Sequence, residues 1–299
     1  MLVLPLPRYR EEGKKIAEAA GWRVVEAIYK VFPDGEIYLR IPDPGAVSEE
    51  RVLVATTMFP GQNEAFLELL LAADALRKSG AREILALIPY LAYGRQDKVF
   101  LHGEPVSGRV VLGALKWAGY SKVIVADYHS TILAKEYSEM LVDVSVVDLL
   151  VEASAKHAPD PVVVLPDKGG YERFGPLLSR LGVEFDYLVK ERDRVTGAVK
   201  ILPKSVSVRG RSVVLVDDII STGGTVAEAS RMLLEQGAER IVVAATHGLL
   251  VGDALRKILS SGVSKIVLAN TISHRVSDPA VEYVDVSERL AETVVKALS

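Results

Sequence analysis

The sequence predicts an α/β fold with two similar domains, each a mostly parallel sheet flanked by helices. Short apolar runs alternate with helical patterns along almost the whole chain, an order that is typical of parallel sheets. Segments of the first half also recur, in the same order, in the second half. The 299 residues are enough for two domains of common size. We therefore expect domains at 1–145 and 146–299, with a last helix that can pack back on the first domain.

The predicted strands are short runs without a polar face, as in strands that are buried on both sides of a parallel sheet. They lie at 52–56, 84–89, 123–126, 162–165, 213–216, 241–245 and 266–269. Between them, apolar residues recur at helical spacing. These helical patterns lie at 63–79, 108–119, 170–181 and 225–237.

The internal repeat consists of three ordered matches. RKSGAREILALIPY at 77–90 parallels LEQGAERIVVAATH at 234–247. The pair RVLVATTMFPGQNEAF and SVVLVDDIISTGGTVAEA precedes that match, and the pair AGYSKVIVADYHS and SGVSKIVLANTISH follows it. Three matches in one order favour a duplicated domain over a chance likeness between two βαβ units.

Composition excludes several classes of protein. The net charge of −3 gives no bulk attraction to nucleic acid or membranes. The chain has no cysteine, which excludes disulfides and thiolate metal sites. Its first residues lack the pattern of a signal peptide, and no apolar run is long enough to span a bilayer. We therefore expect a soluble cytoplasmic protein.

A candidate anion site follows the predicted strand at 213–216. Asp217 and Asp218 come directly after this strand, and the segment STGGT at 221–225 leads into the next helix. N–H groups at a helix N-terminus bind phosphate, glycines let the backbone approach an anion, and hydroxyl groups add donors. The carboxylates cannot bind that phosphate, but they can accept hydrogen bonds from sugar hydroxyls. The segment therefore suits a sugar phosphate held at both ends; the alternative is an ordinary turn with a serine N-cap.

Two polar segments of the first half are candidate nucleotide contacts. Phe32, Asp34 and Glu36 surround a Pro-Asp-Gly turn, which local rules predict as a plain hairpin. The same residues could offer a purine an aromatic face and two acceptors. The cluster RQDK at 95–98 follows a strand, where α/β sheets bind ligands, and its cations could meet a polyphosphate. The alternative for this cluster is a solvated charged loop.

Three further positions carry groups that could bind metal or phosphate. Asp127 and His129 follow the strand at 123–126, and residues two apart on a strand share a side. Asp167 follows the strand at 162–165 and is a candidate Mg²⁺ or hydroxyl ligand. Lys190 and Arg192 lie in the charged segment VKERDR, which could be a solvated arm or a cationic lid over a transferring phosphate.

Together these segments resemble the ribose-phosphate pyrophosphokinases, or phosphoribosyl-pyrophosphate synthetases, with a pattern closer to the archaeal members. FPDGE, RQDK, DYHS, PDKGG, VKERDR and VDDIISTGGT occur in the family's order over nearly the whole chain. RQDK followed by the acid-pair loop is the specific combination, since phosphoribosyltransferases carry only the loop. The resemblance implies two phosphoribosyltransferase-like domains, the first on the ATP side and the second with the ribose 5-phosphate loop.

The resemblance also assigns roles to individual residues. At ATP it implies contacts from Phe32, Asp34, Gly35, Glu36, Arg95, Gln96 and Asp97. At ribose 5-phosphate it implies contacts from Arg192, Asp217, Asp218, Ser221, Thr222, Gly223, Gly224 and Thr225. The implied cofactor is Mg²⁺, held by His129 and Asp167 with Asp127 nearby. Lys190 would be the catalytic lysine and Arg192 its catalytic companion.

The family's reaction moves the β,γ-diphosphate of ATP to the 1-hydroxyl of ribose 5-phosphate and releases AMP. Its adenine contacts come from a neighbouring subunit, so the resemblance implies a homo-oligomer, at least a dimer. Two alternatives remain: a phosphoribosyltransferase that acts on a base, and a non-catalytic subunit of the synthetase. RQDK, the duplication and the Lys190 arm count against the first. The presence of Lys190, Arg192 and the acid pair counts against the second.

Three positions depart from the family pattern. Tyr128 stands where many members have leucine, so its ring is expected to narrow the metal site. Lys168 follows Asp167 where bacterial enzymes usually have a small apolar residue. Ser221 stands where aspartate is common, which removes a negative charge beside the phosphate. These departures bear on regulation and nucleotide selectivity more than on the reaction.

Overall fold

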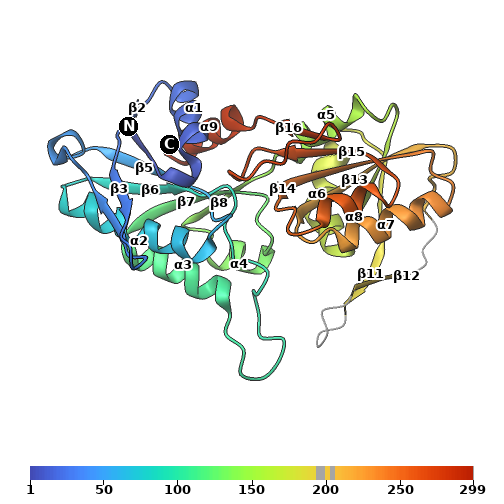
Figure 1. Ribbon diagram of the computed structural model, residues 1–299, viewed down its shortest axis with the longest axis horizontal. Helices are drawn as coiled ribbons and strands as arrows, with labels where there is room; N and C mark the ends of the chain where they lie inside the picture. Colours follow the sequence, from blue (N-terminus) through green and yellow to red (C-terminus); the bar gives the residue numbers. More distant parts are fainter. Residues whose placement is uncertain (193–198, 203–205, 299) are drawn as a thin grey trace. The chain divides into compact units, whose positions relative to one another are not determined.

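The computed structural model describes residues 1–192, 199–202 and 206–298, with only the backbone for 190–192 and 199–202 (Figure 1). The chain folds into two compact units. Unit 1 comprises Met1–Val144, Thr271–His274 and Val286–Ser299. Unit 2 comprises Ser145–Asn270 and Arg275–Asp285. None of the helices in the described residues is long and apolar enough to cross a membrane.

Unit 1 is built on a six-stranded parallel sheet in the order β2-β1-β5-β6-β7-β8. These strands are β1 (Leu2–Pro5), β2 (Arg23–Val24), β5 (Arg51–Ala55), β6 (Glu83–Leu87), β7 (Tyr120–Ala126) and β8 (Leu141–Val144). Helices α1 (Arg10–Ala20) and α9 (Ser287–Ala297) pack side by side on one face, and α2 (Gln62–Lys78) and α3 (Ser107–Ala118) cover the other (Figure 1). The short α4 (Thr131–Glu136) follows β7, and η1 (Pro7–Tyr9) and η2 (Pro44–Ala46) are single turns.

Unit 2 repeats this architecture with a six-stranded parallel sheet in the order β10-β9-β13-β14-β15-β16. Its strands are β9 (Val162–Leu165), β10 (Phe185–Tyr187), β13 (Ser212–Ile220), β14 (Arg240–Gly248), β15 (Val263–Ala269) and β16 (Val281–Val284). Helices α5 (Val147–Ala155) and α6 (Lys168–Arg180) cover one face, and α7 (Gly224–Glu235) and α8 (Ala254–Leu259) cover the other.

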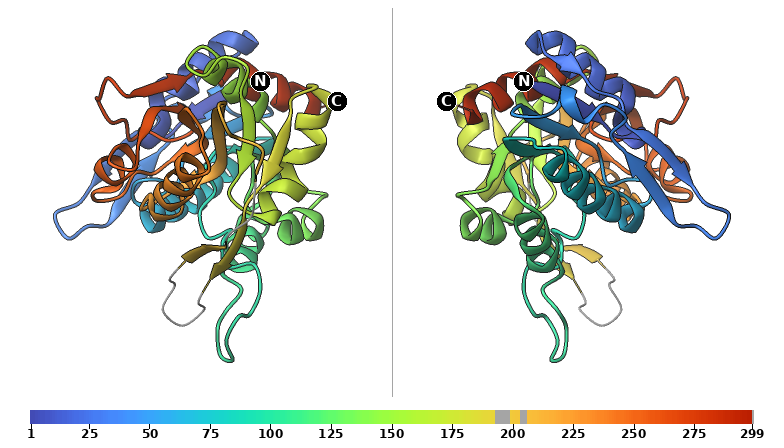
Figure 2. Two further views of the ribbon diagram at one scale, coloured as in Figure 1. Left: turned by 90° about the vertical axis from the view of Figure 1, so that its right-hand side faces the viewer. Right: turned by 90° about the vertical axis from the view of Figure 1, so that its left-hand side faces the viewer.

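Each unit also carries an antiparallel hairpin between its second and third sheet strands. In unit 1 this hairpin is β3 (Ile28–Val31) with β4 (Ile37–Arg40), and Figure 2 shows it standing out from the sheet. In unit 2 it is β11 (Val189–Arg192) with β12 (Val199–Leu202). The two sheets have the same strand order and the same place for the hairpin, which confirms the predicted fold class of two similar parallel-sheet domains.

Burial explains why the predicted strands form. Residues Val213 to Val216 are fully buried, as are Val163 to Leu165 and Ile241 to Ala245. Strands that are covered on both faces need no polar side, because helices pack above and below them. The carboxyl ends of these strands therefore point polar groups toward one edge of each sheet, which is where the candidate site lies.

Candidate functional site

The predicted phosphate loop connects β13 to α7 in unit 2. Helix α7 begins at Gly224, and its N-cap is Gly223 in the left-handed conformation with φ of 73°. A methyl group at Gly223 would lie 2.9 Å from Cγ1 of Ile258 and 3.1 Å from the carbonyl oxygen of Ala254. The loop thus packs directly on α8, and only glycine fits both the backbone conformation and the space.

Lys257 of α8 strengthens this support. Its Nζ donates a hydrogen bond of 3.2 Å to the carbonyl oxygen of Thr222 and lies 3.5 Å from the carboxylate of Asp253. The N–H of Val251 donates to the carbonyl oxygen of Ser221 at 2.9 Å. Two carbonyl oxygens of the loop are therefore held by α8 and the residues just before it. This matters because a carbonyl oxygen that faced a bound anion would repel it.

We expect Lys257→Met to weaken ribose 5-phosphate binding roughly 3- to 10-fold, the usual effect of losing one such hydrogen bond. The matched control is Arg256→Met on the same helix. Arg256 also pairs with Asp253, but its side chain is 83% exposed and no contact to the loop is described for it. Calorimetric titration with ribose 5-phosphate checks the prediction, and equal affinities for the two variants would contradict it.

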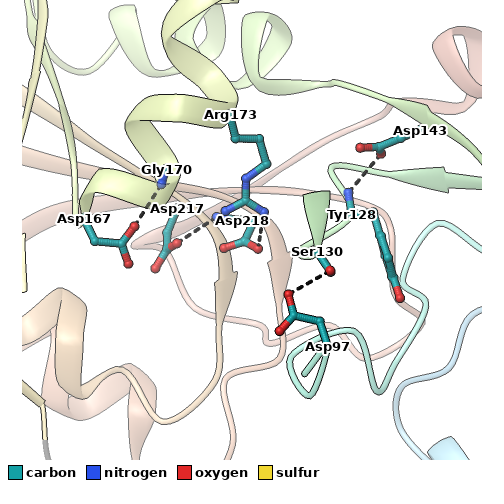
Figure 3. Close-up of polar contacts among 9 residues, drawn as sticks. All are labelled: Asp97, Tyr128, Ser130, Asp143, Asp167, Gly170, Arg173, Asp217 and Asp218. Carbon is teal, nitrogen blue, oxygen red and sulfur yellow. Dashed lines mark hydrogen bonds and ion pairs between the residues drawn. The ribbon is translucent and has the colours of Figure 1, made fainter. Parts of the chain in front are cut away.

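The acid pair extends β13 instead of ending it, because the strand runs on to Ile220. Asp218 is only 3% exposed, and its Oδ2 lies 2.8 Å from a guanidinium nitrogen of Arg173 in α6 (Figure 3). The N–H of Asp218 donates to Oδ1 of Asp217 at 2.9 Å. Asp217 is half-buried. The two carboxylates therefore differ in exposure.

Asp167, a predicted metal ligand in unit 2, is the N-cap of α6. Its Oδ1 accepts a hydrogen bond of 2.9 Å from the N–H of Gly170, an interaction that stabilises the start of a helix (Figure 3). The next residue, Lys168, is exposed and reaches Glu172 one turn on, at 3.5 Å. Lys168, which departs from the family pattern, thus forms an ion pair on the surface of α6.

In unit 1, hydrogen bonds join the RQDK segment to neighbouring hydroxyl groups. Ser107 donates to Oε1 of Gln96 at 2.6 Å, and Ser130 donates to Oδ2 of Asp97 at 2.8 Å (Figure 3). Arg95 is exposed. Because Ser130 directly follows His129, the structure brings together RQDK and DYHS, two segments that the sequence analysis had singled out separately.

The residues after β7 differ from expectation. Strand β7 ends at Ala126, and Asp127 has a positive φ of 44°. This conformation ends the alternation of a strand, so Asp127 is buried whereas His129 is exposed, and the argument that they share a side is wrong. Within the described residues no group of three or more histidine, aspartate and glutamate side chains is arranged as a metal site.

Tyr128 is a packing residue of unit 1 and is only 3% exposed. A methyl group at Gly94 would lie 2.8 Å from its ring, so the ring packs on the backbone of the RQDK loop. Its N–H donates to Oδ1 of Asp143 at 2.9 Å (Figure 3). Burial, with a smaller contribution from the Asp97 and Asp143 carboxylates, raises the pKa of the Tyr128 phenol. The ring fills the interior of unit 1, so the expectation that it narrows a metal site has no support in its position.

The FPDGE segment forms the predicted hairpin turn between β3 and β4. The N–H of Phe32 donates to the carbonyl oxygen of Glu36 at 2.8 Å, and Asp34 accepts from the N–H of Glu36 at 3.2 Å. The half-exposed ring of Phe32 lies edge-on to Tyr38, with Nζ of Lys30 4.5 Å from its centroid. The turn thus presents an aromatic ring and carboxylates at one end of the hairpin.

Tyr29 attaches this hairpin to the body of unit 1. Its hydroxyl donates to Oε1 of the fully buried Glu68 on α2 at 2.7 Å. Oε2 of Glu68 also lies 3.3 Å from Nε of Arg8, and a terminal guanidinium nitrogen of Arg8 donates to the carbonyl oxygen of Pro60 at 2.6 Å. Burial and the hydrogen bond to Glu68 raise the pKa of Tyr29 to about 12.

This pKa predicts a loss of stability at alkaline pH. A phenol whose pKa is higher in the folded than in the unfolded chain stabilises the fold fully below about pH 10 and loses that contribution as pH rises toward about 12. We expect the urea midpoint of the wild type to fall more steeply between pH 9 and 11.5 than that of Tyr29→Phe, which cannot titrate. Parallel curves for the two proteins would exclude Tyr29 as the titrating group.

The two predicted catalytic cations lie on the hairpin of unit 2. The backbone of Lys190 pairs with Ile201 and that of Arg192 with Val199. The side chains of both residues lie outside the part of the chain that is described.

Comparisons with known proteins agree with this arrangement. Residues 1–119 match the N-terminal domain of ribose phosphate pyrophosphokinase, and residues 136–283 match the phosphoribosyl transferase domain. The ribose-phosphate pyrophosphokinase of Sulfurisphaera tokodaii is 40% identical over 89% of this chain and 90% of its own length. That of Aeropyrum pernix is 37% identical over 97% and 94%. The chain belongs to the ribose-phosphate pyrophosphokinase family.

A solved structure supports the same family assignment. The phosphoribosylpyrophosphate synthetase of Mycobacterium smegmatis superposes with a TM-score of 0.88 at 27% identity, covering 99% of this chain and 98% of that one.

Sequence reasoning missed two side chains of this family member that support the candidate site. Arg173 and Lys257 contact the acid pair and the phosphate loop from helices that lie 45 and 35 residues away in sequence. Neither residue belongs to a recognisable motif. Each is a single basic residue in a predicted or short helix, and such a residue does not identify its partner.

Proposed function

We propose that this protein is a ribose-phosphate diphosphokinase, a homo-oligomeric cytoplasmic enzyme. It transfers the β,γ-diphosphate of ATP to the 1-hydroxyl of ribose 5-phosphate and gives phosphoribosyl diphosphate and AMP. The observation that carries the proposal is the site in unit 2. There, an acid pair and a glycine-containing phosphate loop share the carboxyl end of β13, in a chain whose unit 1 carries the linked RQDK and DYHS segments.

The loop and the acid pair account for sugar phosphate binding. Backbone N–H groups and hydroxyls from Ser221 to Thr225, at the N-terminus of α7, suit the 5-phosphate. The acid pair at 217 and 218 supplies carboxylate for the ribose hydroxyls, because a carboxylate accepts hydrogen bonds and repels phosphate. Arg192 is proposed as a further contact to ribose 5-phosphate.

ATP binding is assigned to unit 1. We assign the nucleotide to Phe32, Asp34, Gly35, Glu36, Arg95, Gln96 and Asp97. The first four belong to the hairpin turn, and we propose that they reach the adenine of a neighbouring subunit, so that the enzyme is at least a dimer. Phe32 supplies the aromatic face, while Arg95 is exposed and can meet phosphate oxygens.

Mg²⁺ is the proposed cofactor, with His129, Asp167 and Asp127 as its candidate protein contacts. The carboxylate oxygens among them are the donors that this ion prefers. Mg²⁺ keeps several waters and takes substrate phosphates as ligands, so one or two protein carboxylates per ion suffice. The residues present therefore fit the ion. When bound, it would neutralise charge on the phosphate oxygens.

Transfer of a diphosphoryl group depends mainly on positioning and on neutralisation of charge. The loop and the acids are proposed to hold the sugar at both ends. Lys190 and Arg192 are proposed to offset the negative charge that develops on the transferred group. No covalent intermediate on the protein is required.

Phosphorus NMR tests the proposal directly. Purified protein is mixed with ATP, Mg²⁺ and ribose 5-phosphate, and AMP is expected to appear in step with a sugar-linked diphosphate. ADP with a singly phosphorylated sugar would indicate an ordinary kinase instead. Binding of ribose 5-phosphate without any reaction would favour a phosphoribosyltransferase or a non-catalytic subunit. A base-dependent release of diphosphate distinguishes those two.

A further inference from the structure

Asp217 and Asp218 are neighbours in sequence, but Asp218 is buried whereas Asp217 is half-buried. Strand β13 continues in regular register, with Asp217 opposite Ala245 and Ile219 opposite His247. Val213 and Leu215 pack in the core with residues of α7 and α8. Its contact with Arg173 of α6 places the Asp218 side chain on the face of the sheet that α5 and α6 cover.

Asp218 is held on its face by a buried ion pair. Arg173 reaches it from α6 at 2.8 Å, and the two side chains are only 13% and 4% exposed. The guanidinium also lies 4.8 Å from the ring centroid of the buried Phe174. Two charges withdrawn from water in this way depend on each other, because removing either leaves an uncompensated charge in the interior. So little of the Asp218 surface is exposed that a sugar has scant access to it.

Asp217 is more exposed than Asp218. It is half-buried and lies four residues before Ser221, the first residue of the phosphate loop. Its Oδ1 accepts the N–H of Asp218 at 2.9 Å. A continuous series of contacts therefore runs from the Arg173 guanidinium through the Asp218 carboxylate and backbone to the Asp217 carboxylate (Figure 3).

We propose that Arg173 is a positioning residue, which orients Asp217 toward the pentose hydroxyls by fixing Asp218. This inference rests on the proposed function, and it divides the roles within an acid pair to which the sequence analysis gave one shared role. It also explains why a basic residue of α6 is directed toward a sugar site, where a cation would otherwise compete for the carboxylates.

The test compares three variants by calorimetric titration with ribose 5-phosphate: Asp217→Asn, the double variant Arg173→Gln/Asp218→Asn, and Arg173→Lys. Asp217→Asn is expected to weaken binding about 10- to 100-fold without lowering the melting temperature, the effect of losing hydrogen bonds to a charged acceptor. The double variant removes both buried charges together and is expected to bind at least about tenfold more tightly than Asp217→Asn. Binding as weak as that of Asp217→Asn, in a folded double variant, would make Asp218 a direct sugar contact and overturn the proposal.

Arg173→Lys keeps the buried charge and therefore the fold, but it loses the planar guanidinium. We expect the KM for ribose 5-phosphate to rise roughly 3- to 10-fold, with kcat and the KM for ATP nearly constant. An unchanged KM for ribose 5-phosphate would overturn the positioning role even if the double variant failed to fold. Wild-type protein that bound no ribose 5-phosphate would refute the proposed function itself, so the two failures are distinguishable.

Discussion

Replacing Lys190 by alanine lowers turnover about 10²- to 10³-fold, the usual cost of removing one group that stabilises transition-state charge. The dissociation constant for ribose 5-phosphate should change less than about twofold, because an interaction made mainly in the transition state contributes little to ground-state binding. AMP formation at saturating substrate gives kcat, and calorimetry gives the affinity.

Lys200→Ala is the matched control for this experiment. Lys200 lies on the same hairpin, where its backbone pairs with that of Glu191, one residue from Lys190. Loss of positive charge from the hairpin is identical in the two variants. If Lys200→Ala reduces turnover as much as Lys190→Ala, the hairpin acts through its overall charge, and normal turnover of Lys190→Ala would remove this residue from the mechanism.

The strands and helices of the interior could be predicted because their patterns are local. The runs at 162–165 and 213–216 both lie in observed strands, and the helix expected at 63–79 is Gln62–Lys78. Strand β1 was not predicted, although Leu2, Val3 and Leu4 are fully buried, because its apolar run is brief and is followed by prolines. Its neighbours in the sheet, which determine its conformation, come from elsewhere in the chain.

In the candidate site, too, the local patterns could be predicted from the sequence and the tertiary contacts could not. Glycines and hydroxyls in the order STGGT, after two acids, indicate a sugar-phosphate loop because the chemistry is contained within one segment. The different burial of Asp217 and Asp218 depends on Arg173, and the position of the loop depends on Lys257 and Ile258. These contacts arise from tertiary packing, so no pattern in the sequence specifies them. The positive φ of Asp127 is a similar case, since a strand pattern does not reveal where the alternation ends.

Gly223→Ala is expected to have the largest effect on ribose 5-phosphate binding among substitutions of the loop backbone. Alanine at φ of 73° has a conformational cost of about 1–2 kcal/mol. Its methyl group would also lie 2.9 Å from Cγ1 of Ile258 and 3.1 Å from the backbone oxygen of Ala254, so the loop or α8 must move. Because bound phosphate depends on the placement of backbone N–H groups, we expect the dissociation constant to rise more than about tenfold.

Gly210→Ala separates the two causes. Gly210 has nearly the same backbone conformation, with φ of 70°, but a methyl group there would meet no atom within 4 Å. Both variants should therefore lose about 1–2 kcal/mol of unfolding free energy from the left-handed backbone, and only Gly223→Ala should lose further stability and ribose 5-phosphate affinity. Urea unfolding and calorimetry measure the two quantities. If both variants bind ribose 5-phosphate equally well, close packing of the loop on α8 does not position its N–H groups. The roles given to Gly223 and Lys257 would then both be wrong.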